Sequence, residues 1–280
     1  MNPLREIHRD DHLLAVHKPA GLLVHRSPID RHETEFALQH ARELNGGGHV
    51  YPVHRLDRPT SGLLLFARDP DTASALGRAF MAGEVGKTYL AVVRGWAPEA
   101  GLIDHPLREH ATDRRDTSEQ PLREALTRYR RLATCELPVA VERYPASRYS
   151  LVELRPETGR KHQLRRHMQH IGHPIIGDTN YGRTRHNHYF AQRFGGSRLM
   201  LAAIALRLVH PATGEPLVLA AAPEESFLRV LSIFGQDVVT AAATPGWPGD
   251  DGAGSGAAGA AAAGICPGDA ADAAVIGRQG

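Results

Sequence analysis

The residues with the clearest chemical potential lie in one short segment, HRLDRPTSG, at positions 54–62. Its aspartate, Asp57, stands between Arg55 and Arg58, and nearby cations keep a carboxylate ionised. An ionised carboxylate in a fixed position can act as a nucleophile or as a base. The same spacing also fits a turn aspartate that accepts hydrogen bonds from backbone amides and does no chemistry. From spacing alone, the structural role is the simpler interpretation.

A second polar segment, TGRKHQLRRH, occupies positions 158–167. Gly159 ends a predicted strand, and a predicted helix over residues 161–171 follows it. This helix would turn an apolar stripe toward the core and leave polar residues on or near its other side: His162, Arg165, Arg166 and Gln169. A basic face that starts at a helix N-terminus suits anionic groups. A solvated charged face would show the same pattern, so both interpretations stay open here.

Other kinds of site find little support in the sequence. Four histidines lie close together, but their spacing does not place all of them on one helix face: His162, His167, His170 and His173. No cysteine and no H-E-x-x-H pattern accompanies them, so we expect no metal site. Gly46–Gly48 follows a predicted helix instead of opening one, so neither nucleotide-binding glycine fingerprint is present.

The elements that must position these segments alternate without a regular βαβ rhythm. Apolar patterning predicts strands over 13–17, 22–25, 63–67, 87–93, 124–134, 148–155, 199–209 and 217–221. Helical spacing and capping residues predict helices over 35–44, from Asp69 or Asp71 to 81, over 161–171 and over 224–234. Residues 94–122 read as one long polar connection, and a loop of that length is usually functional. Adjacent strand pairs with a few helices indicate an α+β fold with a mixed, mainly antiparallel sheet and flanking helices.

Composition divides the chain after residue 235. Residues 236–280 contain 27 Ala, Gly or Pro among 45 residues, too little apolar area to offset the entropy lost on ordering. We therefore predict a folded domain over 1–235 and a disordered tail over 236–280. The predicted domain carries 32 Lys and Arg against 26 Asp and Glu. Only three of the basic residues are lysines. Arginine suits bidentate phosphate contacts, although a genome-wide compositional bias would give the same ratio.

The chain shows no apolar run long enough to span a membrane, and its first residues show no hydrophobic signal segment. Its two cysteines, Cys135 and Cys266, cannot build a disulfide framework. We therefore expect a soluble, cytoplasmic protein.

Four motifs in a fixed order resemble the signature of the RluA-type RNA pseudouridine synthases. They are KPAG at 18–21, HRLDRPTSG with its apolar strand at 54–67, KTY at 87–89, and TGRKHQLRRH with a continuation to 178. The likeness runs from about residue 7 to about residue 235 and contains no accessory domain of S4 type. Relatives often read LHA in the late strand, whereas this chain has Ala202 in place of that histidine.

The resemblance implies the pseudouridine synthase fold with a central RNA-binding cleft, and an enzyme that isomerises a uridine within RNA. The C1′–N1 bond breaks, the base turns and a C1′–C5 bond forms, so no cofactor is required. The uridine must leave the base stack to be reached. Asp57 matches the catalytic carboxylate, and Arg165 matches the arginine that would hold it in a bidentate pair. Tyr89 matches the pocket tyrosine, whose ring can stack on the uracil and whose hydroxyl can serve in proton transfer.

Other motif residues are implied to bind the RNA. Arg55 matches a residue that fills the gap left by the flipped base, with a phosphate contact as the alternative, and Leu164 is expected to line the pocket floor. The remaining expected contacts are His54, Arg160, Lys161 and Arg166. Recognition by shape and phosphates is expected, because A-form helices hide their major-groove edges.

Within the family, further segments such as Val93–Trp96 most resemble members that act on tRNA, which implies uridine 65 of the T-stem as the target. We expect a monomer that needs no protein partner and no membrane. Ribosomal RNA relatives share every catalytic motif, so a ribosomal target is the alternative. Two further alternatives are a non-catalytic RNA-binding or chaperone protein of this fold and a hydrolase that uses Asp57 with His54 or His162. The intact catalytic set opposes the first, and a hydrolase would release free uracil.

Overall fold

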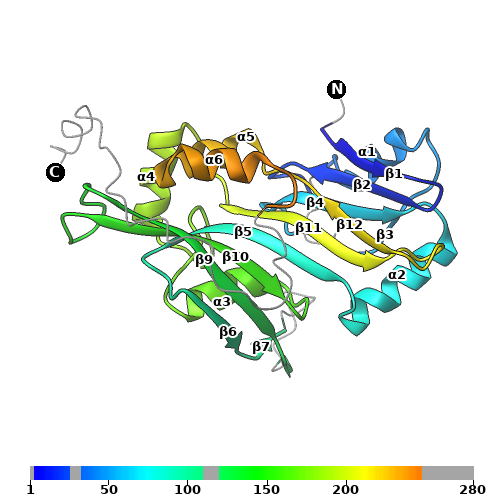
Figure 1. Cartoon of the computed structure of the whole chain (residues 1–280), viewed down its shortest axis with the longest axis horizontal. Helices are drawn as coiled ribbons and strands as arrows, with labels where there is room; N and C mark the ends of the chain where they lie inside the picture. The colour runs from blue at the N-terminus through cyan, green and yellow to red at the C-terminus, as the bar shows by residue number, and fades with distance from the viewer. Residues whose placement is uncertain (1–2, 26–32, 110–119, 248–280) are drawn as a thin grey trace.

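The centre of the computed structural model, which describes residues 3–25, 33–109 and 120–247, is a mixed ten-stranded sheet (Figure 1). Its strands are β1 Arg5–Arg9, β2 Leu13–Lys18, β3 Tyr51–Pro52, β4 Ser61–Ala67, β5 Gly86–Arg94, β6 Ala100–Asp104, β9 Leu126–Leu137, β10 Ser147–Pro156, β11 Leu201–Val209 and β12 Pro216–Ala220. A separate pair is formed by β7 Leu107–Arg108 and β8 Leu122–Arg123. The helices are α1 Ala37–Leu44, α2 Pro70–Ala82, α3 Gln163–His170, α4 Thr184–Phe194, α5 Glu225–Leu231, the 3-10 turn η1 Ser232–Phe234 and α6 Gln236–Ala243.

The order of the main sheet is β1-β2-β4-β11-β5-β10-β9-β6, with β12 beside β11 and β3 beside β4. Among the described strands, every pairing is antiparallel except that of β4 with β11. The predicted α+β class with a mixed, mainly antiparallel sheet and flanking helices is confirmed. Figure 1 shows β1, β2 and α1 at one end of the molecule, with α4, α5 and α6 gathered toward the other end.

The parallel contact between β4 and β11 requires a glycine. Ala202 and Ala203 of β11 lie opposite Ser61 and Gly62 of β4. Gly62 has φ +109°, and a Cβ atom there would lie 2.0 Å from the carbonyl oxygen of Ala203. Only glycine combines this backbone conformation with so close an approach. The last residue of the HRLDRPTSG motif therefore lets the strand after Asp57 pack into the middle of the sheet.

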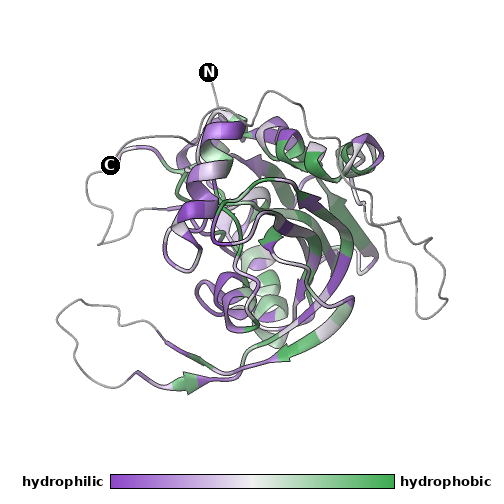
Figure 2. Ribbon diagram, turned by 90° about the vertical axis from the view of Figure 1, so that its left-hand side faces the viewer, coloured by the Kyte–Doolittle hydropathy of each residue, from purple (hydrophilic) through white to green (hydrophobic). Residues whose placement is uncertain are grey.

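Alternation along the strands divides the core between the two faces of the sheet. On β4, Leu64 and Phe66 belong to one buried cluster, whereas Leu63 and Leu65 belong to another. Successive side chains of a strand point to opposite faces, so an entirely apolar strand is buried on both sides. Helix α1 contributes Ala37 and Ala41 to the first cluster, and α2 contributes Leu76 to the second. Figure 2 shows the sheet as a curved layer whose strands carry much of the hydrophobic colour.

Helix α2 begins and ends where its sequence signals predict. Asp69 is the N-cap, and its Oδ1 accepts a hydrogen bond of 2.8 Å from the backbone amide of Thr72. Gly83 ends the helix in the left-handed conformation, with φ +77°. Both features are typical of helix termini, because they satisfy backbone groups that lack an intrahelical partner.

Three connections differ from the sequence prediction. Residues 22–25 form no strand, and only Leu23 makes an isolated bridge, with Phe36. The long connection after β5 contains β6, β7 and β8 on either side of residues 110–119, which lie outside the described part of the chain. Helix α4 was not predicted. The unpredicted elements β6, β7, β8 and α4 are stabilised by contacts with neighbouring strands and helices. Such contacts cannot be predicted from the local sequence pattern.

The predicted domain boundary at residue 235 is wrong for the residues that immediately follow it. Gln236–Ala243 forms α6, and Ala242 is 1% exposed. Val238, Val239 and Trp247 pack against the largest core cluster. A few apolar residues at helical spacing are enough once a surface exists to receive them. Residues 248–280 of the predicted tail lie outside the described residues.

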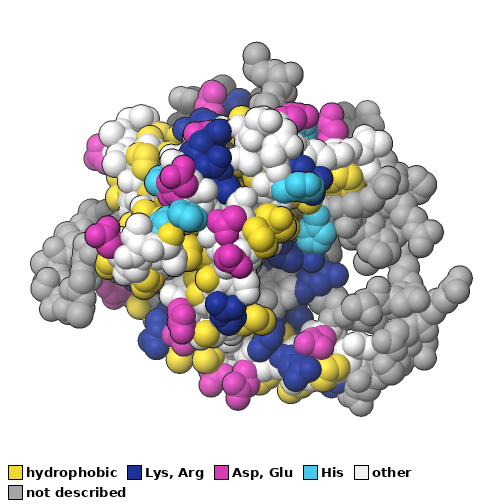
Figure 3. Space-filling view, turned by 90° about the vertical axis from the view of Figure 1, so that its right-hand side faces the viewer, with side chains coloured by type: hydrophobic (Ala, Val, Ile, Leu, Met, Phe, Trp, Pro, Cys, Tyr) yellow, Lys and Arg dark blue, Asp and Glu magenta, His cyan; other side chains and the backbone are white. Residues whose placement is uncertain are grey.

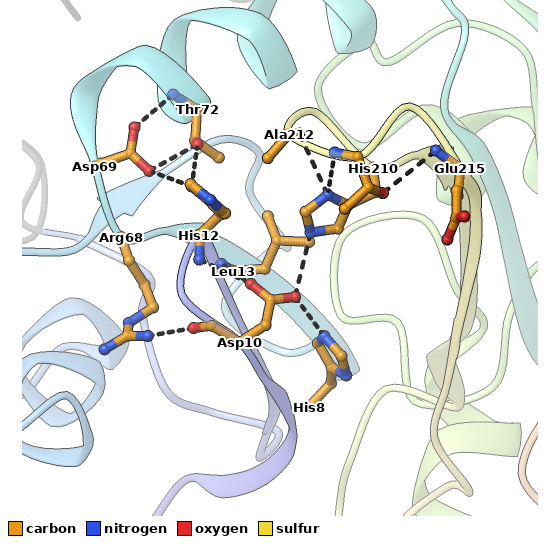
Figure 4. Close-up of polar contacts among 11 residues, drawn as sticks. His8, Asp10, His12, Leu13, Arg68, Asp69, Thr72, His210, Ala212 and Glu215 are labelled. Carbon is orange, nitrogen blue, oxygen red and sulfur yellow. Dashed lines mark hydrogen bonds and ion pairs between the residues drawn. The ribbon is translucent and has the colours of Figure 1, made fainter.

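A polar network far from the HRLDRPTSG segment ties three turns together (Figure 4). Asp10 is its hub: its Oδ1 accepts hydrogen bonds from the backbone amides of His12 and Leu13, and its Oδ2 lies 2.7 Å from His8 Nε2 and 3.3 Å from His210 Nε2. Partial burial works against ionisation, but these hydrogen bonds lower the pKa of Asp10 to about 2. His12 reaches Asp69, the cap of α2, at 3.1 Å. The network therefore joins the β1–β2 turn to α2 and to the loop after β11.

No helix in the described part of the chain is both long and apolar enough to cross a membrane.

Candidate active site

The loop that carries Asp57 is held by buried contacts on both sides. Leu56 is 5% exposed and belongs to the cluster under α1, and Thr60 is 2% exposed. The amide of Thr60 donates to the carbonyl of Asp57 at 3.0 Å, which closes a tight turn. Asp57 itself is partly exposed between these anchors. The catalytic candidate thus lies in a rigid turn, as the adjoining apolar strand predicted.

A buried lysine fixes this turn to the KPAG motif. The ammonium group of Lys18 donates to the carbonyls of Pro19, Leu22 and Arg58 at 2.9, 2.8 and 3.1 Å. Burial lowers the pKa of Lys18 to about 7, although the charges of Glu224 and Asp57 act in the opposite direction. Because one of the three carbonyls belongs to the residue after Asp57, Lys18 sets the position of the Asp57 turn. Sequence reasoning assigned no role to this lysine.

Arg165 lies between two carboxylates. Its Nη1 donates to Asp57 Oδ2 at 3.3 Å, whereas Nε and Nη2 donate to the two oxygens of Asp178 at 2.7 and 2.9 Å. The predicted pairing of Arg165 with Asp57 is present, but it is not bidentate. The planar fork of the guanidinium, formed by Nε and Nη2, binds Asp178 instead. Arg165 and Asp178 are 4% and 2% exposed, so this is a buried ion pair.

Backbone amides of the loop after Ile176 fix the position of the Asp178 carboxylate. Asp178 Oδ1 also accepts hydrogen bonds from the backbone amides of Asn180 and Tyr181, at 2.9 and 3.0 Å. Burial alone would raise the pKa of Asp178, but the hydrogen bonds and charge of Arg165 lower it below its usual value. Asp178 therefore stays ionised and keeps the guanidinium oriented. It stands at the end of the fourth motif, which was the only signal in the sequence that could have identified it.

Tyr89 lies on β5 and packs against two of the core clusters. Burial and the charge of Asp57 raise the pKa of its hydroxyl above the usual value. The phenol is therefore neutral at physiological pH and can donate a proton. Asp57 contacts Arg165 and lies close enough to Tyr89 for its charge to act on the phenol, and the catalytic role of the three residues stays a prediction.

Asp57 and Arg165 open onto a cavity of about 940 Å³. Its lining includes Asp57, Arg165 and the exposed side chains of Arg55 and Lys161. Among the described residues, no ion pair involves Arg55 or Lys161. Both cations are thus available to an anionic ligand at the mouth of the cavity.

Four other predicted contacts have different surroundings. Arg160 donates to the carbonyl of Glu124, and Arg166 donates to that of Arg108 beside the β7–β8 pair. Leu164 is 7% exposed in the largest core cluster and does not line the cavity. Its place on the pocket floor therefore stays a prediction.

His54 is also turned away from the cavity. Its ring stacks on Phe80 of α2, with centroids 4.8 Å apart, and its Nε2 accepts a hydrogen bond from the amide of Leu65 at 2.9 Å. Burial lowers the pKa of His54 to about 3. A neutral histidine that binds a strand amide is a structural residue, so its predicted RNA contact is not supported.

The histidines of the second segment do not converge. His167 contacts Thr127 and the carbonyl of His105, whereas His173 contacts the carbonyl of Arg94. His170 stacks on His105 with centroids 3.7 Å apart. In the described parts of the chain, no group of three or more His, Cys, Asp or Glu side chains is arranged to hold a metal ion.

Comparison with known proteins identifies the family of this chain. Residues 12–170 match the family model described as RNA pseudouridylate synthase. The chain belongs to this family and is an RNA pseudouridine synthase.

Individual relatives are similar over most of their length. The tRNA pseudouridine synthase C of Vibrio cholerae serotype O1 is 48% identical over 235 residues, which are 83% of this chain and 96% of the relative. That of Yersinia pestis is 51% identical over 235 residues, 83% of this chain and 91% of the relative. Among solved structures, human RNA Pseudouridylate Synthase Domain Containing 4 is 26% identical with a TM-score of 0.61, covering 82% of this chain and 92% of that one.

Proposed function

We propose that this enzyme converts uridine 65 in the T-stem of tRNA to pseudouridine, with Asp57 as its catalytic carboxylate. The observation that carries the proposal is the contact of Asp57 with the buried Arg165–Asp178 pair at an open cavity, with Tyr89 near enough to be affected by the charge of Asp57. The tRNA target rests on the names of the two bacterial relatives, which match this chain over almost their whole length.

In this proposal, the target uridine leaves the stack and enters the cavity. The Asp57 carboxylate faces C1′ and balances the positive charge that develops there as the C1′–N1 bond breaks. The freed uracil turns, C5 bonds to C1′, the proton on C5 is lost and N1 gains one. Arg165 keeps Asp57 ionised and oriented, because a charge-assisted hydrogen bond favours the carboxylate form.

Tyr89 serves the base in two ways. Its ring offers a face for the uracil, and its neutral hydroxyl stands ready to take part in the proton exchange between C5 and N1. The raised pKa of that hydroxyl keeps it protonated, so the neutral phenol enters the exchange. No metal or organic cofactor enters these steps.

The RNA backbone is held by cations at the cavity mouth. Arg55 and Lys161 line the cavity directly, and Arg160 and Arg166 extend the basic surface along the start of α3. On the face shown in Figure 3, Lys and Arg side chains gather on both sides of the hollow between the upper and lower parts of the molecule. Phosphate contacts of this kind supply affinity without reading sequence. We place the enzyme in the cytoplasm as a monomer that acts on tRNA without a protein partner.

The test is pseudouridine mapping of total RNA from matched strains with and without the gene. We expect one modification to disappear, at position 65 of tRNAs, and to return when the gene is restored. Loss at a ribosomal RNA position with intact tRNA would assign a different target. An unchanged map, together with free uracil released by the purified protein, would point to a hydrolase.

A further inference from the structure

His162 has a backbone conformation that costs energy. It is the only non-glycine residue with a positive φ in the described ranges, at φ +56° and ψ +23°. A left-handed conformation is uncommon for residues other than glycine, although asparagine, aspartate and histidine adopt it more often than the rest, and it persists at functional sites when the surroundings enforce it. His162 stands directly before α3 and lines the cavity that contains Asp57.

Capping of the helix does not explain this conformation. The His162 side chain makes no capping hydrogen bond to α3. The segment is instead anchored by Gln163, whose Oε1 accepts hydrogen bonds from Thr158 Oγ1 and from the amide of Arg160, and whose Nε2 donates to the carbonyl of Leu126. Glycine or asparagine would fit the backbone with less strain. The backbone conformation alone therefore does not select histidine, and the contacts of the imidazole ring decide what it does in the site.

The ring lies between Tyr181 and Asp57. His162 Nδ1 is 3.1 Å from the hydroxyl of Tyr181, and His162 Nε2 is 3.9 Å from Asp57 Oδ2. If the phenol donates to Nδ1, the proton of the neutral ring is on Nε2 and faces the carboxylate. The opposite tautomer would turn a lone pair toward Asp57, which is unfavourable.

Tyr181 connects this arm to the Arg165–Asp178 pair. Its backbone amide donates to Asp178 Oδ1 at 3.0 Å, and the Arg165 guanidinium lies 5.2 Å from its ring centroid. Two chains of contacts therefore link Asp178 to Asp57. One runs through Arg165, and the other runs through Tyr181 and His162. Both routes end on the same oxygen, Oδ2.

We propose that His162 and Tyr181 are positioning residues, which hold Asp57 Oδ2 together with Arg165 and so aim the other carboxylate oxygen at the reacting carbon. This inference rests on the proposed function of Asp57. A separation of 3.9 Å exceeds that of a hydrogen bond, and catalytic contacts often tighten only when the substrate is bound. When the uridine occupies the cavity, the His162 ring moves within hydrogen-bond distance of Asp57. The hydrogen bond from Tyr181 keeps the proton on His162 Nε2, directed at the carboxylate.

The experiment compares Tyr181→Phe, His162→Asn and the double variant in single-turnover assays at saturating tRNA. Phenylalanine removes only the hydroxyl, and asparagine tolerates the left-handed backbone while removing the imidazole. We expect each single variant to lower the isomerisation rate roughly 10- to 100-fold, since small errors of alignment have effects of that size. The double variant should be no slower than His162→Asn, because Tyr181 acts through His162. Affinity for tRNA and the melting temperature should stay close to wild type.

The matched control is Tyr144→Phe, which removes an exposed tyrosine hydroxyl in the β9–β10 connection and should not change the rate. Rates within twofold of wild type for Tyr181→Phe and His162→Asn would overturn the inference. So would independent effects that multiply in the double variant, or a lower melting temperature with an unchanged rate. Failure of the proposed function gives a different result, since the wild-type protein itself would then form no pseudouridine in tRNA.

Discussion

Arg165 donates from Nε and Nη2 to both carboxylate oxygens of Asp178, at 2.7 and 2.9 Å, and leaves only Nη1 for Asp57. A guanidinium held in this way cannot rotate freely, because its plane is set by the carboxylate that shares its fork. The orientation of Asp57 therefore depends on Asp178 as well as on Arg165, because Asp178 holds the guanidinium that contacts Asp57. This relationship makes separate predictions for the two aspartates.

Asp57→Asn should eliminate isomerisation and leave tRNA affinity nearly unchanged. The amide has almost the same shape but is a far weaker nucleophile and base, and removal of a negative charge does not weaken binding to a polyanion. Carbodiimide-based detection of pseudouridine in tRNA, paired with an RNA titration, measures both effects. Appreciable turnover by this variant would refute the assignment of Asp57.

Asp178→Asn should lower both turnover and stability. It leaves the buried Arg165 charge without its ionised partner, and breaking a buried pair in this way costs about 3–5 kcal/mol. Chemical denaturation gives the loss of stability. Asp71→Asn on the surface of α2 is the control, with no expected change in either quantity. An Asp178→Asn protein as stable and active as wild type would contradict the structural role given to the pair.

Arg165→Lys should recover only part of the activity lost in Arg165→Ala. Lysine keeps the positive charge but cannot contact two carboxylates through one planar group. Single-turnover rates of the two variants, with their melting temperatures, make the comparison. If the lysine variant matched wild type, the geometry of the fork would be irrelevant to catalysis.

The protein should lose stability as the pH falls from about 6.5 to about 4, in part because of His17. This histidine on β2 is 6% exposed, and its Nε2 has no hydrogen-bond partner among the described residues. Burial lowers its pKa to about 4, with further lowering by nearby cations. Between the two pKa values the unfolded chain binds a proton that the folded protein does not, so acid favours unfolding by at most about 3 kcal/mol.

Denaturation curves across this pH range test the prediction with His17→Gln, which should show a shallower pH dependence. The slope should not vanish, because His54 has its pKa lowered to about 3 and titrates in the same direction. The exposed residue His188 supplies the control variant His188→Gln, which should keep the wild-type slope. Asp10 contributes only below about pH 4, since its pKa in the folded protein is about 2. An unchanged slope in His17→Gln would show that His17 does not titrate differently on folding.

Truncation should distinguish the two candidate ends of the folded domain. A chain ending at Gly235 loses α6 and Trp247, which pack on the largest core cluster, and should melt several degrees lower. A loss of about 1 kcal/mol corresponds to roughly 2–4 °C in a domain of this size. A chain ending at Trp247 should melt like the full chain, because the composition of 248–280 offers little apolar surface to bury. Equal melting temperatures for both shortened chains would show that the folded domain ends at residue 235.

Most of the secondary structure could be predicted from the sequence, because it depends on local signals. The apolar run over 63–67 became the buried strand β4, and Asp69 and Gly83 became the caps of α2. Helix α4 and helix α6 could not be predicted in this way. Their apolar residues are few, and they are stabilised by surfaces contributed by distant parts of the chain.

The residue types of the site were likewise determined by the sequence itself, and their partners were decided by the tertiary structure. The motifs supplied Asp57, Tyr89 and Arg165 with their charges and hydrogen-bonding groups, and these properties do not depend on the fold. The fold alone paired the Nε and Nη2 groups of Arg165 with Asp178, buried Lys18 beside the Asp57 turn, stacked His54 on Phe80 and placed Leu164 in the core. A side chain of given chemistry can satisfy its hydrogen bonds with many partners, and only the packing of separate segments in the folded chain selects among them.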